Sequence, residues 1–212
     1  QTLRVVMFLE NKYLKYSGLN LSIETLEGLL KHNGPVEDLD LVDSLIGIKR
    51  FKNMINFNTY PSLEAQISAI SDDIAYNNHD IQDGIRAKLF TLNELKEINF
   101  FNDIIKSHKK NTKRKNQEIL IYQVIRDSIN LMVQDLINTT MKNINYLKIK
   151  NYNDIYKSKI NLVSFSDKLI NVEKEIKHFL KIKMYNNKNV MKKNNNGKKI
   201  IRKLFKDIKN KP

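Results

Sequence analysis

The sequence predicts an all-α protein, a multi-helix bundle without β-structure. Almost every segment of its 212 residues carries apolar residues at helical spacing, and only three prolines and six glycines interrupt that pattern. No segment alternates apolar and polar residues in the manner of a half-buried strand. We therefore expect helices that pack against one another at ordinary ridge-into-groove angles.

The first hundred residues contain clear helix start and stop signals. Residues 2–16 read as a helix, although lysines and tyrosines interrupt the apolar run. Ser22 is placed to cap the next helix, and the sequence Asn33-Gly34-Pro35 ends it. The segment 35–60 is less regular and predicts a short helix within a loop region. Pro61-Ser62 then opens a helix over residues 62–83, which Gly84 terminates.

The second half of the chain continues in the same way. Thr91 and Glu94 form a capping box in front of a helix that reaches residue 108. A basic link over 108–116 precedes a long helix over 117–147. Ser166-Asp167 begins another helix, which ends near Met184-Tyr185.

The C-terminal residues differ in composition from the rest. Residues 186–198 are of low complexity and are predicted to be mobile. A short basic amphipathic helix follows them and closes the chain. We divide the sequence into a helical region at 1–106, which contains the helix 62–83, and a basic helical region at 107–212.

Charge is unevenly distributed between these halves. Residues 1–100 carry 10 Lys and Arg against 14 Asp and Glu, a net charge of −4. The remaining residues carry 27 against 9, a net charge of +18, which agrees with +14 for the whole chain. A basic half can attract nucleic acid or nucleotide triphosphates, but lysine in a sequence rich in Lys, Asn and Ile also fills solvated faces by default.

Composition excludes several classes of protein. The chain contains no cysteine, which excludes disulfides and thiolate metal sites and suits a cytoplasmic protein. No segment is apolar for long enough to cross a bilayer, so we expect no membrane partner. The chain opens on Gln1 and runs directly into a helical pattern, and we expect its natural start to lie upstream.

The helix predicted over 62–83 has two unlike faces. Its apolar stripe consists of Leu63, Ile67, Ile70, Ile74 and Ile81. The opposite face carries Asp72, Tyr76 and Asp80 at intervals of four residues, so that consecutive members are neighbours one turn apart. These groups can bind a cation or order a polar ligand, and a solvated helix face is the simpler interpretation of the spacing alone.

Three sequence blocks together resemble a known family. They are GLNLSIETLEGLLKHNGP (18–35), SLEAQISAISDDIAYNNHDIQDGIRAKLFTL (62–92) and FLKIKMYNNKNV (179–190). In order and spacing they are similar to the C-terminal part of bacterial deoxyguanosine triphosphate triphosphohydrolase-like proteins of the HD superfamily, which end in a phosphohydrolase-associated region. The resemblance spans essentially the whole chain and is loose over 39–60 and beyond residue 106.

This resemblance implies an activity and a set of site residues. Enzymes of the family hold a divalent metal ion, Mg or Mn, through a His, a His-Asp doublet and a distant Asp, and a metal-activated water cleaves a deoxynucleoside triphosphate into deoxynucleoside and triphosphate. By motif position Asp72 matches the distant Asp ligand, Tyr76 and Asp80 match residues against the deoxyribose, and Lys31 would reach the triphosphate. A homo-oligomer is also implied.

The other metal ligands are expected upstream of Gln1. His79-Asp80 follows the ligand Asp in sequence and therefore cannot be the doublet. We predict no complete catalytic set within this segment, which alone would be inactive. Two alternatives are a basic module that binds nucleic acid and a helical module that only mediates oligomerisation.

Overall fold

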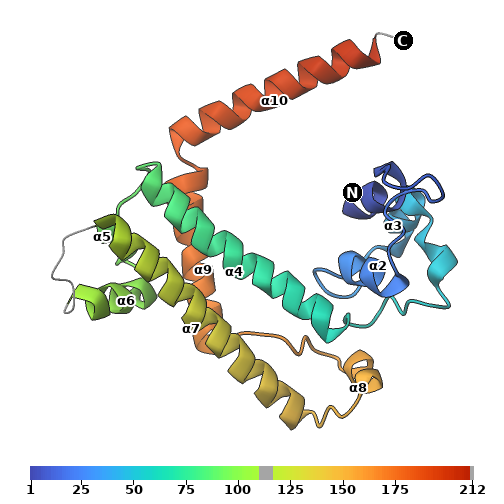
Figure 1. Ribbon diagram of the computed structural model, residues 1–212, viewed down its shortest axis with the longest axis horizontal. Helices are drawn as coiled ribbons and strands as arrows, with labels where there is room; N and C mark the ends of the chain where they lie inside the picture. Colours follow the sequence, from blue (N-terminus) through green and yellow to red (C-terminus); the bar gives the residue numbers. More distant parts are fainter. Residues whose placement is uncertain (110–116, 211–212) are drawn as a thin grey trace. The chain divides into compact units, whose positions relative to one another are not determined.

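A computed structural model describes residues 1–109 and 117–210 of the chain, and all regular secondary structure in these residues is helical (Figure 1). The all-α prediction is thereby confirmed. The chain forms two compact units that interleave in sequence: unit 1 comprises residues 1–73 and 133–166, and unit 2 comprises residues 74–132 together with those from 167 onward. The division predicted at residue 106 concerns family regions and stays a prediction.

Unit 1 begins with a helical segment shorter than the sequence pattern suggests. Helix α1 (Thr2–Arg4) continues into a π-helical turn, η1 (Val5–Leu9), and the backbone is extended at Glu10. The prediction of a helix as far as residue 16 is therefore wrong beyond Leu9. The chain folds back instead, and Gly18 packs against the backbone of η1 with a φ of +66°.

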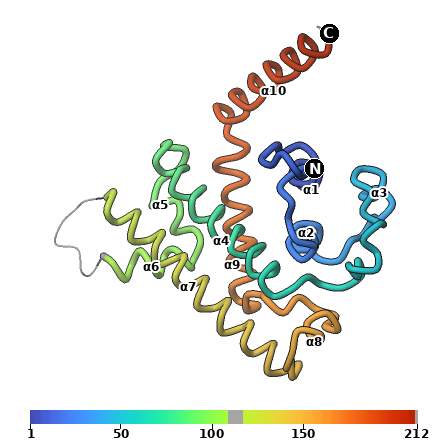
Figure 2. Tube along the Cα trace, turned by 45° about the vertical axis from the view of Figure 1, so that its right-hand side comes forward, coloured from blue at the N-terminus to red at the C-terminus, as the bar shows by residue number. Residues whose placement is uncertain are grey.

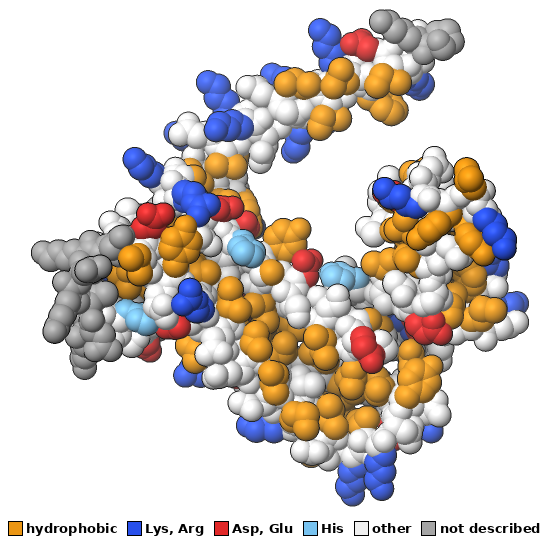
Figure 3. All heavy atoms as spheres, viewed as in Figure 1, with side chains coloured by type: hydrophobic (Ala, Val, Ile, Leu, Met, Phe, Trp, Pro, Cys, Tyr) orange, Lys and Arg blue, Asp and Glu red, His pale blue; other side chains and the backbone are white. Residues whose placement is uncertain are grey.

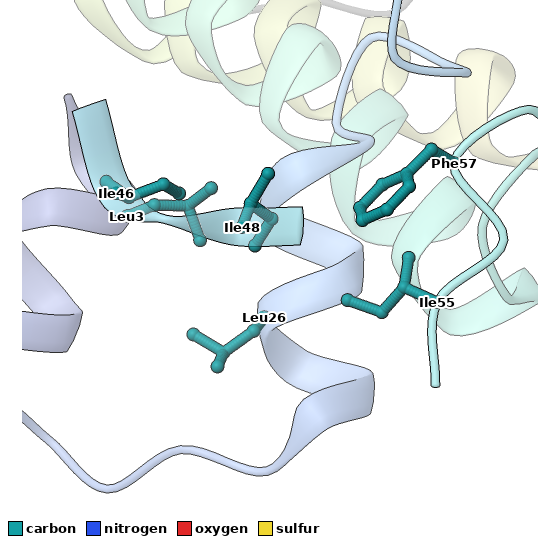
Figure 4. Close-up of a cluster of buried hydrophobic side chains, with 6 residues drawn as sticks. All are labelled: Leu3, Leu26, Ile46, Ile48, Ile55 and Phe57. Atoms are coloured by element: carbon teal, nitrogen blue, oxygen red, sulfur yellow. The ribbon is translucent and has the colours of Figure 1, made fainter. Parts of the chain in front are cut away.

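Two further helices complete the hydrophobic core of unit 1. Helix α2 (Ile23–Leu30) begins at the predicted cap, Ser22, whose Oγ accepts a hydrogen bond from the amide of Thr25. Helix α3 (Leu39–Ile46) and the short 3-10 helix η2 (Ile48–Phe51) lie in the region predicted to contain a short helix. Their apolar side chains pack with Leu3 of α1 and with Ile55 and Phe57, which follow η2. The resulting cluster, shown in Figure 4, consists of Leu3, Leu26, Ile46, Ile48, Ile55 and Phe57.

Helix α4 (Leu63–Arg86) is the helix predicted over residues 62–83, and it continues past the predicted end. Gly84 lies inside the helix. A glycine is required at this position because the ring of Phe90 occupies the space that a side chain would fill, and a Cβ on Gly84 would lie 2.2 Å from Phe90 Cε1. Phe90 in turn packs edge-to-face on Phe179, with ring centroids 4.9 Å apart. This glycine therefore serves a close aromatic contact rather than a helix stop.

In the remainder of unit 1, side-chain hydrogen bonds hold a segment that has no regular secondary structure. It contains the later part of helix α7 (Gln117–Tyr146), helix α8 (Tyr152–Lys157) and an irregular segment over 158–166. The buried Gln66 of α4 accepts hydrogen bonds from the backbone amides of Leu162 and Val163 at 2.9 and 3.1 Å. Burying irregular backbone requires such partners, and Gln66 supplies them.

Unit 2 contains the rest of α4 and α7 together with shorter helices. The capping box predicted at Thr91 and Glu94 is present, but it begins a short helix, α5 (Leu92–Leu95), which is separate from helix α6 (Asn99–Lys109). The long helix predicted over 117–147 is confirmed as α7. Most of the basic link predicted over 108–116 lies outside the described residues.

The C-terminal part of unit 2 runs through three helical segments, and Figure 2 traces this part of the chain in orange and red. Helix α9 (Asp167–Leu180) starts where the sequence predicts, and a π-helical turn, η3 (Lys181–Tyr185), follows it. Lys183 of η3 donates to Glu94 Oε1 at 2.9 Å, so η3 is attached to the capping box of α5.

Helix α10 (Lys188–Lys209) contains no buried residue. It starts within the segment 186–198, which the sequence predicts to be mobile, and the backbone of this segment is helical from Lys188 onward. Figure 3 shows hydrophobic side chains gathered along α10, with Lys and Arg projecting from it. Its exposed apolar residues are Met191, Ile200, Ile201, Leu204, Phe205 and Ile208. Among residues 1–109 and 117–210, no helix has both the length and the apolar character needed to span a membrane.

Two glycines allow a test of the close contact between Gly18 and the backbone of η1. Gly18 and Gly47 have nearly the same positive φ, +66° and +64°, but a Cβ on Gly18 would lie 2.3 Å from the carbonyl oxygen of Val6 and a Cβ on Gly47 would meet nothing within 4 Å. Left-handed backbone costs an alanine about 1–2 kcal/mol. We expect Gly47→Ala to cost about that much and Gly18→Ala clearly more, as measured by urea unfolding of the chain. Equal losses would contradict the close contact.

The link between η3 and α5 predicts a pH dependence. The hydrogen bond from Lys183, followed by that from the Thr91 amide, lowers the pKa of Glu94 from 4.5 to about 2. A lowered pKa in the folded state means that this contribution to stability is present above pH 4.5 and is lost as the pH falls towards 2. We expect the Glu94 carboxyl resonance to titrate near pH 2 by NMR. Lys183→Met should raise this midpoint, and the control Lys181→Met should not.

Candidate functional site

One helix, α4, carries three of the four predicted site residues. Asp72, Tyr76 and Asp80 follow one another at one-turn intervals, as the sequence predicts, although the division between the units falls between Asp73 and Ile74. Asp72 is exposed, Tyr76 is 62% exposed and Asp80 is half-buried. Within the described residues this face of α4 is therefore largely open to a ligand.

A small cavity in unit 1 lies beside the first part of this helix. Its volume is about 210 Å³. Ala69 and Asp73 of α4 line it, and Ala65 lies one turn earlier, where a Cβ on Gly28 of α2 would approach its Cβ to 3.0 Å. The small residues at 65 and 69 thus admit close neighbours on this side of α4. The other lining residues are Lys31, His32, Asn33, Gly34, Tyr60, Pro61, Gln66, Ile70 and Asn161.

The fourth predicted residue, Lys31, is fully buried in unit 1. Its Nζ donates to Glu27 Oε1 at 2.5 Å and to Thr59 Oγ1 at 3.0 Å. The Tyr156 hydroxyl donates to the other Glu27 oxygen at 3.2 Å, and burial, followed by the Glu27 charge, raises the pKa of Tyr156. The attraction within a buried ion pair offsets the desolvation of its charges only when further hydrogen bonds support it, and Thr59 and Tyr156 each supply one.

Lys31 is therefore already bound to Glu27 and Thr59 within the described part of the chain. The structure brings it to the cavity wall but does not aim its ammonium at the face of Asp72. Its predicted contact with a triphosphate stays a prediction.

Asp80 has a partner that sequence reasoning missed. The hydroxyl of Tyr185, at the end of η3, donates a hydrogen bond to Asp80 Oδ2. Burial, followed by the hydrogen bond to Asp80, raises the pKa of Tyr185 to about 12. Tyr185 lies within the block 179–190 that carries the family resemblance, but the spacing of residues in that block does not indicate which residue of α4 Tyr185 contacts.

The sequence also did not predict the buried amide side chains on the apolar face of α4. Of the predicted apolar stripe, Ile74 and Ile81 are buried, whereas Ile67 is 46% exposed. Asn77 and Asn78, which border the stripe, are buried instead. Asn78 Nδ2 donates to the carbonyl of Ile74, while Asn77 Nδ2 and Asn78 Oδ1 have no partner among the described residues.

As a metal site, this part of the chain offers a single predicted ligand. The described residues contain no cluster of three or more His, Cys, Asp or Glu side chains that could hold an ion. Asp72 fits the chemistry of such a ligand, because an exposed carboxylate is a hard ligand suited to Mg²⁺ or Mn²⁺.

Comparison with known proteins places the chain among a defined set of relatives. It is 66% identical over 212 residues to a deoxyguanosinetriphosphate triphosphohydrolase-like protein of Pelagibacter ubique, matching all of this chain and 57% of that protein. Proteins of the same name from Bartonella henselae and Rickettsia felis are each 35% identical, over 97% of this chain and 52% and 53% of their own lengths. No family model matches the chain.

These relatives confirm the resemblance that the three sequence blocks indicate. Identity extends over the whole of this chain, whereas the chain spans about half the length of the curated relatives it matches. The chain belongs to the deoxyguanosinetriphosphate triphosphohydrolase-like proteins, over that part of their length.

Proposed function

We propose that this chain forms part of the active site of a metal-dependent deoxynucleoside triphosphate triphosphohydrolase of the HD superfamily. The observation that carries the proposal is the open face of α4, where Asp72, Tyr76 and Asp80 lie one turn apart. The printed names of the relatives supply the substrate class. The remaining metal ligands belong to the half of the relatives that this chain does not span.

The three residues divide the work of binding. The carboxylate of Asp72 provides one ligand for a divalent cation, which when bound supplies Lewis-acid activation for the attack of water on the α-phosphorus. The bond from this phosphorus to the 5′ oxygen breaks, and the products are the deoxynucleoside and triphosphate. Tyr76 presents a largely exposed phenol to the sugar, and Asp80, one turn further, accepts a hydrogen bond from its 3′ hydroxyl.

A second candidate function rests on α10. This helix combines exposed apolar residues with Lys and Arg and has no buried residue, which suits a module that contacts nucleic acid or other subunits. Phosphate contacts weaken steeply with added salt. Binding of single-stranded DNA that weakens in this way would support the nucleic-acid module, and concentration-dependent assembly without DNA binding would support the oligomerisation module.

A matched pair of carboxylates tests the assignment of Asp72 in the full-length parent protein. Asp83 lies on the same side of α4 and is also exposed, where it pairs only loosely with Arg86 at 3.7 Å. We expect Asp72→Asn to weaken Mn²⁺ binding and to lower triphosphate release from dGTP by a factor of about 100 or more, since removing a ligand should exceed the 10–100-fold effect of outer-shell changes. Asp83→Asn should change neither. Normal Mn²⁺ affinity in Asp72→Asn would refute the assignment.

The isolated 212 residues provide a second test. With Asp72 as its single predicted ligand, the chain should release no triphosphate from dGTP in the presence of Mn²⁺, while the full-length parent should do so and should lose this activity on treatment with EDTA. Release of triphosphate by the isolated chain would show that the site is complete without the upstream part.

A further inference from the structure

We propose that Tyr185 is a positioning residue for Asp80 and thereby contributes to recognition of the sugar 3′ hydroxyl. The proposal rests on the proposed function, because it requires Asp80 to face the sugar. It adds a residue from the C-terminal part of the chain to a site otherwise built on α4.

The contact joins two segments that are remote in sequence and lie within unit 2. Tyr185 and Asp80 are 105 residues apart, and the phenol donates to Asp80 Oδ2. Asp80 Oδ1 accepts no hydrogen bond from the described residues. One carboxylate oxygen is therefore held by the protein, and the other is available to a ligand hydroxyl.

The π-helical turn gives Tyr185 its direction. In η3 the backbone amide of Asn186 donates to the carbonyl of Lys181 at 3.0 Å, a hydrogen bond that spans five residues instead of four. This wider turn holds one more residue than an α-helical turn, so it changes the direction in which the last side chains project. Turns of this kind occur frequently at functional sites.

A second attachment fixes η3 in place. Lys183, two residues before Tyr185, donates to Glu94 of the α5 capping box. Glu94 Oε2 in turn accepts hydrogen bonds from the amide and the hydroxyl of Thr91, each at 2.9 Å. The turn that carries Tyr185 is thus held against α5 as well as against Asp80, which limits how far the phenol can move.

The exposure of the pair suits ligand binding rather than core packing. Tyr185 is 48% exposed and Asp80 is half-buried, so a sugar can reach the carboxylate. With its pKa raised to about 12, the phenol stays protonated at neutral pH and remains a donor.

Holding Asp80 in one orientation should sharpen selection for the 3′ hydroxyl. A carboxylate already fixed by a donor needs less ordering when the substrate binds. A site built to accept a hydrogen bond from a hydroxyl rejects an analogue without it, because its acceptor is then left unpaired. Loss of the Tyr185 hydroxyl should therefore weaken the discrimination between dGTP and 2′,3′-dideoxy-GTP.

The test compares variants of the full-length parent protein with these two nucleotides. One hydrogen bond contributes about 0.5–1.5 kcal/mol, which corresponds to a factor of about 2–13. We expect Tyr185→Phe to raise KM for dGTP by such a factor with little change in kcat, and to leave the kinetics with 2′,3′-dideoxy-GTP unchanged. Asp80→Ala should abolish the preference, and the double variant should behave like Asp80→Ala alone.

Tyr122→Phe is the matched control. Tyr122 is a 42% exposed phenol of unit 2 that accepts a hydrogen bond from Arg86 Nη2 at 3.3 Å, and its removal should not alter the ratio of the two nucleotides. An unchanged ratio in Tyr185→Phe, or an equal loss with both nucleotides, would overturn the positioning role. A wild-type parent protein that cleaves no deoxynucleoside triphosphate would overturn the proposed function, and the positioning role with it.

Discussion

The structure depends on a single constraint, that helix α4 must satisfy two environments along 24 uninterrupted residues. One side is buried against neighbours in each unit, while the other remains open and carries carboxylates. A helix can meet both demands because its faces repeat every 3.6 residues, so that burial and chemistry occupy separate arcs of the same element. In unit 2 the ring of Phe90 covers the buried arc at Gly84, whereas in unit 1 the close contact of Ala65 with Gly28 lies on the side of Asp72.

The buried arc of α4 is more polar than its sequence suggests. Gln66 takes the place of a hydrophobic residue because the irregular backbone at Leu162 and Val163 needs an acceptor away from water. Lys31, which follows α2, also needs a buried partner: Glu27 neutralises its charge, and the Tyr156 hydroxyl donates a hydrogen bond to Glu27. Such groups stabilise one arrangement over others, since leaving any one of them unpaired costs about 1–3 kcal/mol.

The sequence predicts local features well and distant pairings poorly. The Ser22 cap, the Thr91 capping box and the one-turn spacing of Asp72, Tyr76 and Asp80 all depend on residues close in sequence, and the structure contains them. The helix predicted to residue 16 and the stop predicted at Gly84 are wrong, because contacts with distant backbone and with an aromatic ring decide those positions. The hydrogen bond between Tyr185 and Asp80 joins residues that are 105 positions apart in the sequence. The spacing of residues within a helix does not predict such a contact.

The open face of α4 and the unpaired amides on its opposite face are separate features of the helix. Asp72 and Asp80 add negative charge to an exposed face, which costs little while water screens it and becomes favourable when a cation binds. Asn77 Nδ2 and Asn78 Oδ1 are buried without partners among the described residues, although native proteins rarely leave such groups unpaired. The two features are independent, because Asn78 is fully buried by this chain's own residues and an added segment could not reach its amide, whereas the carboxylate face stays open to a ligand.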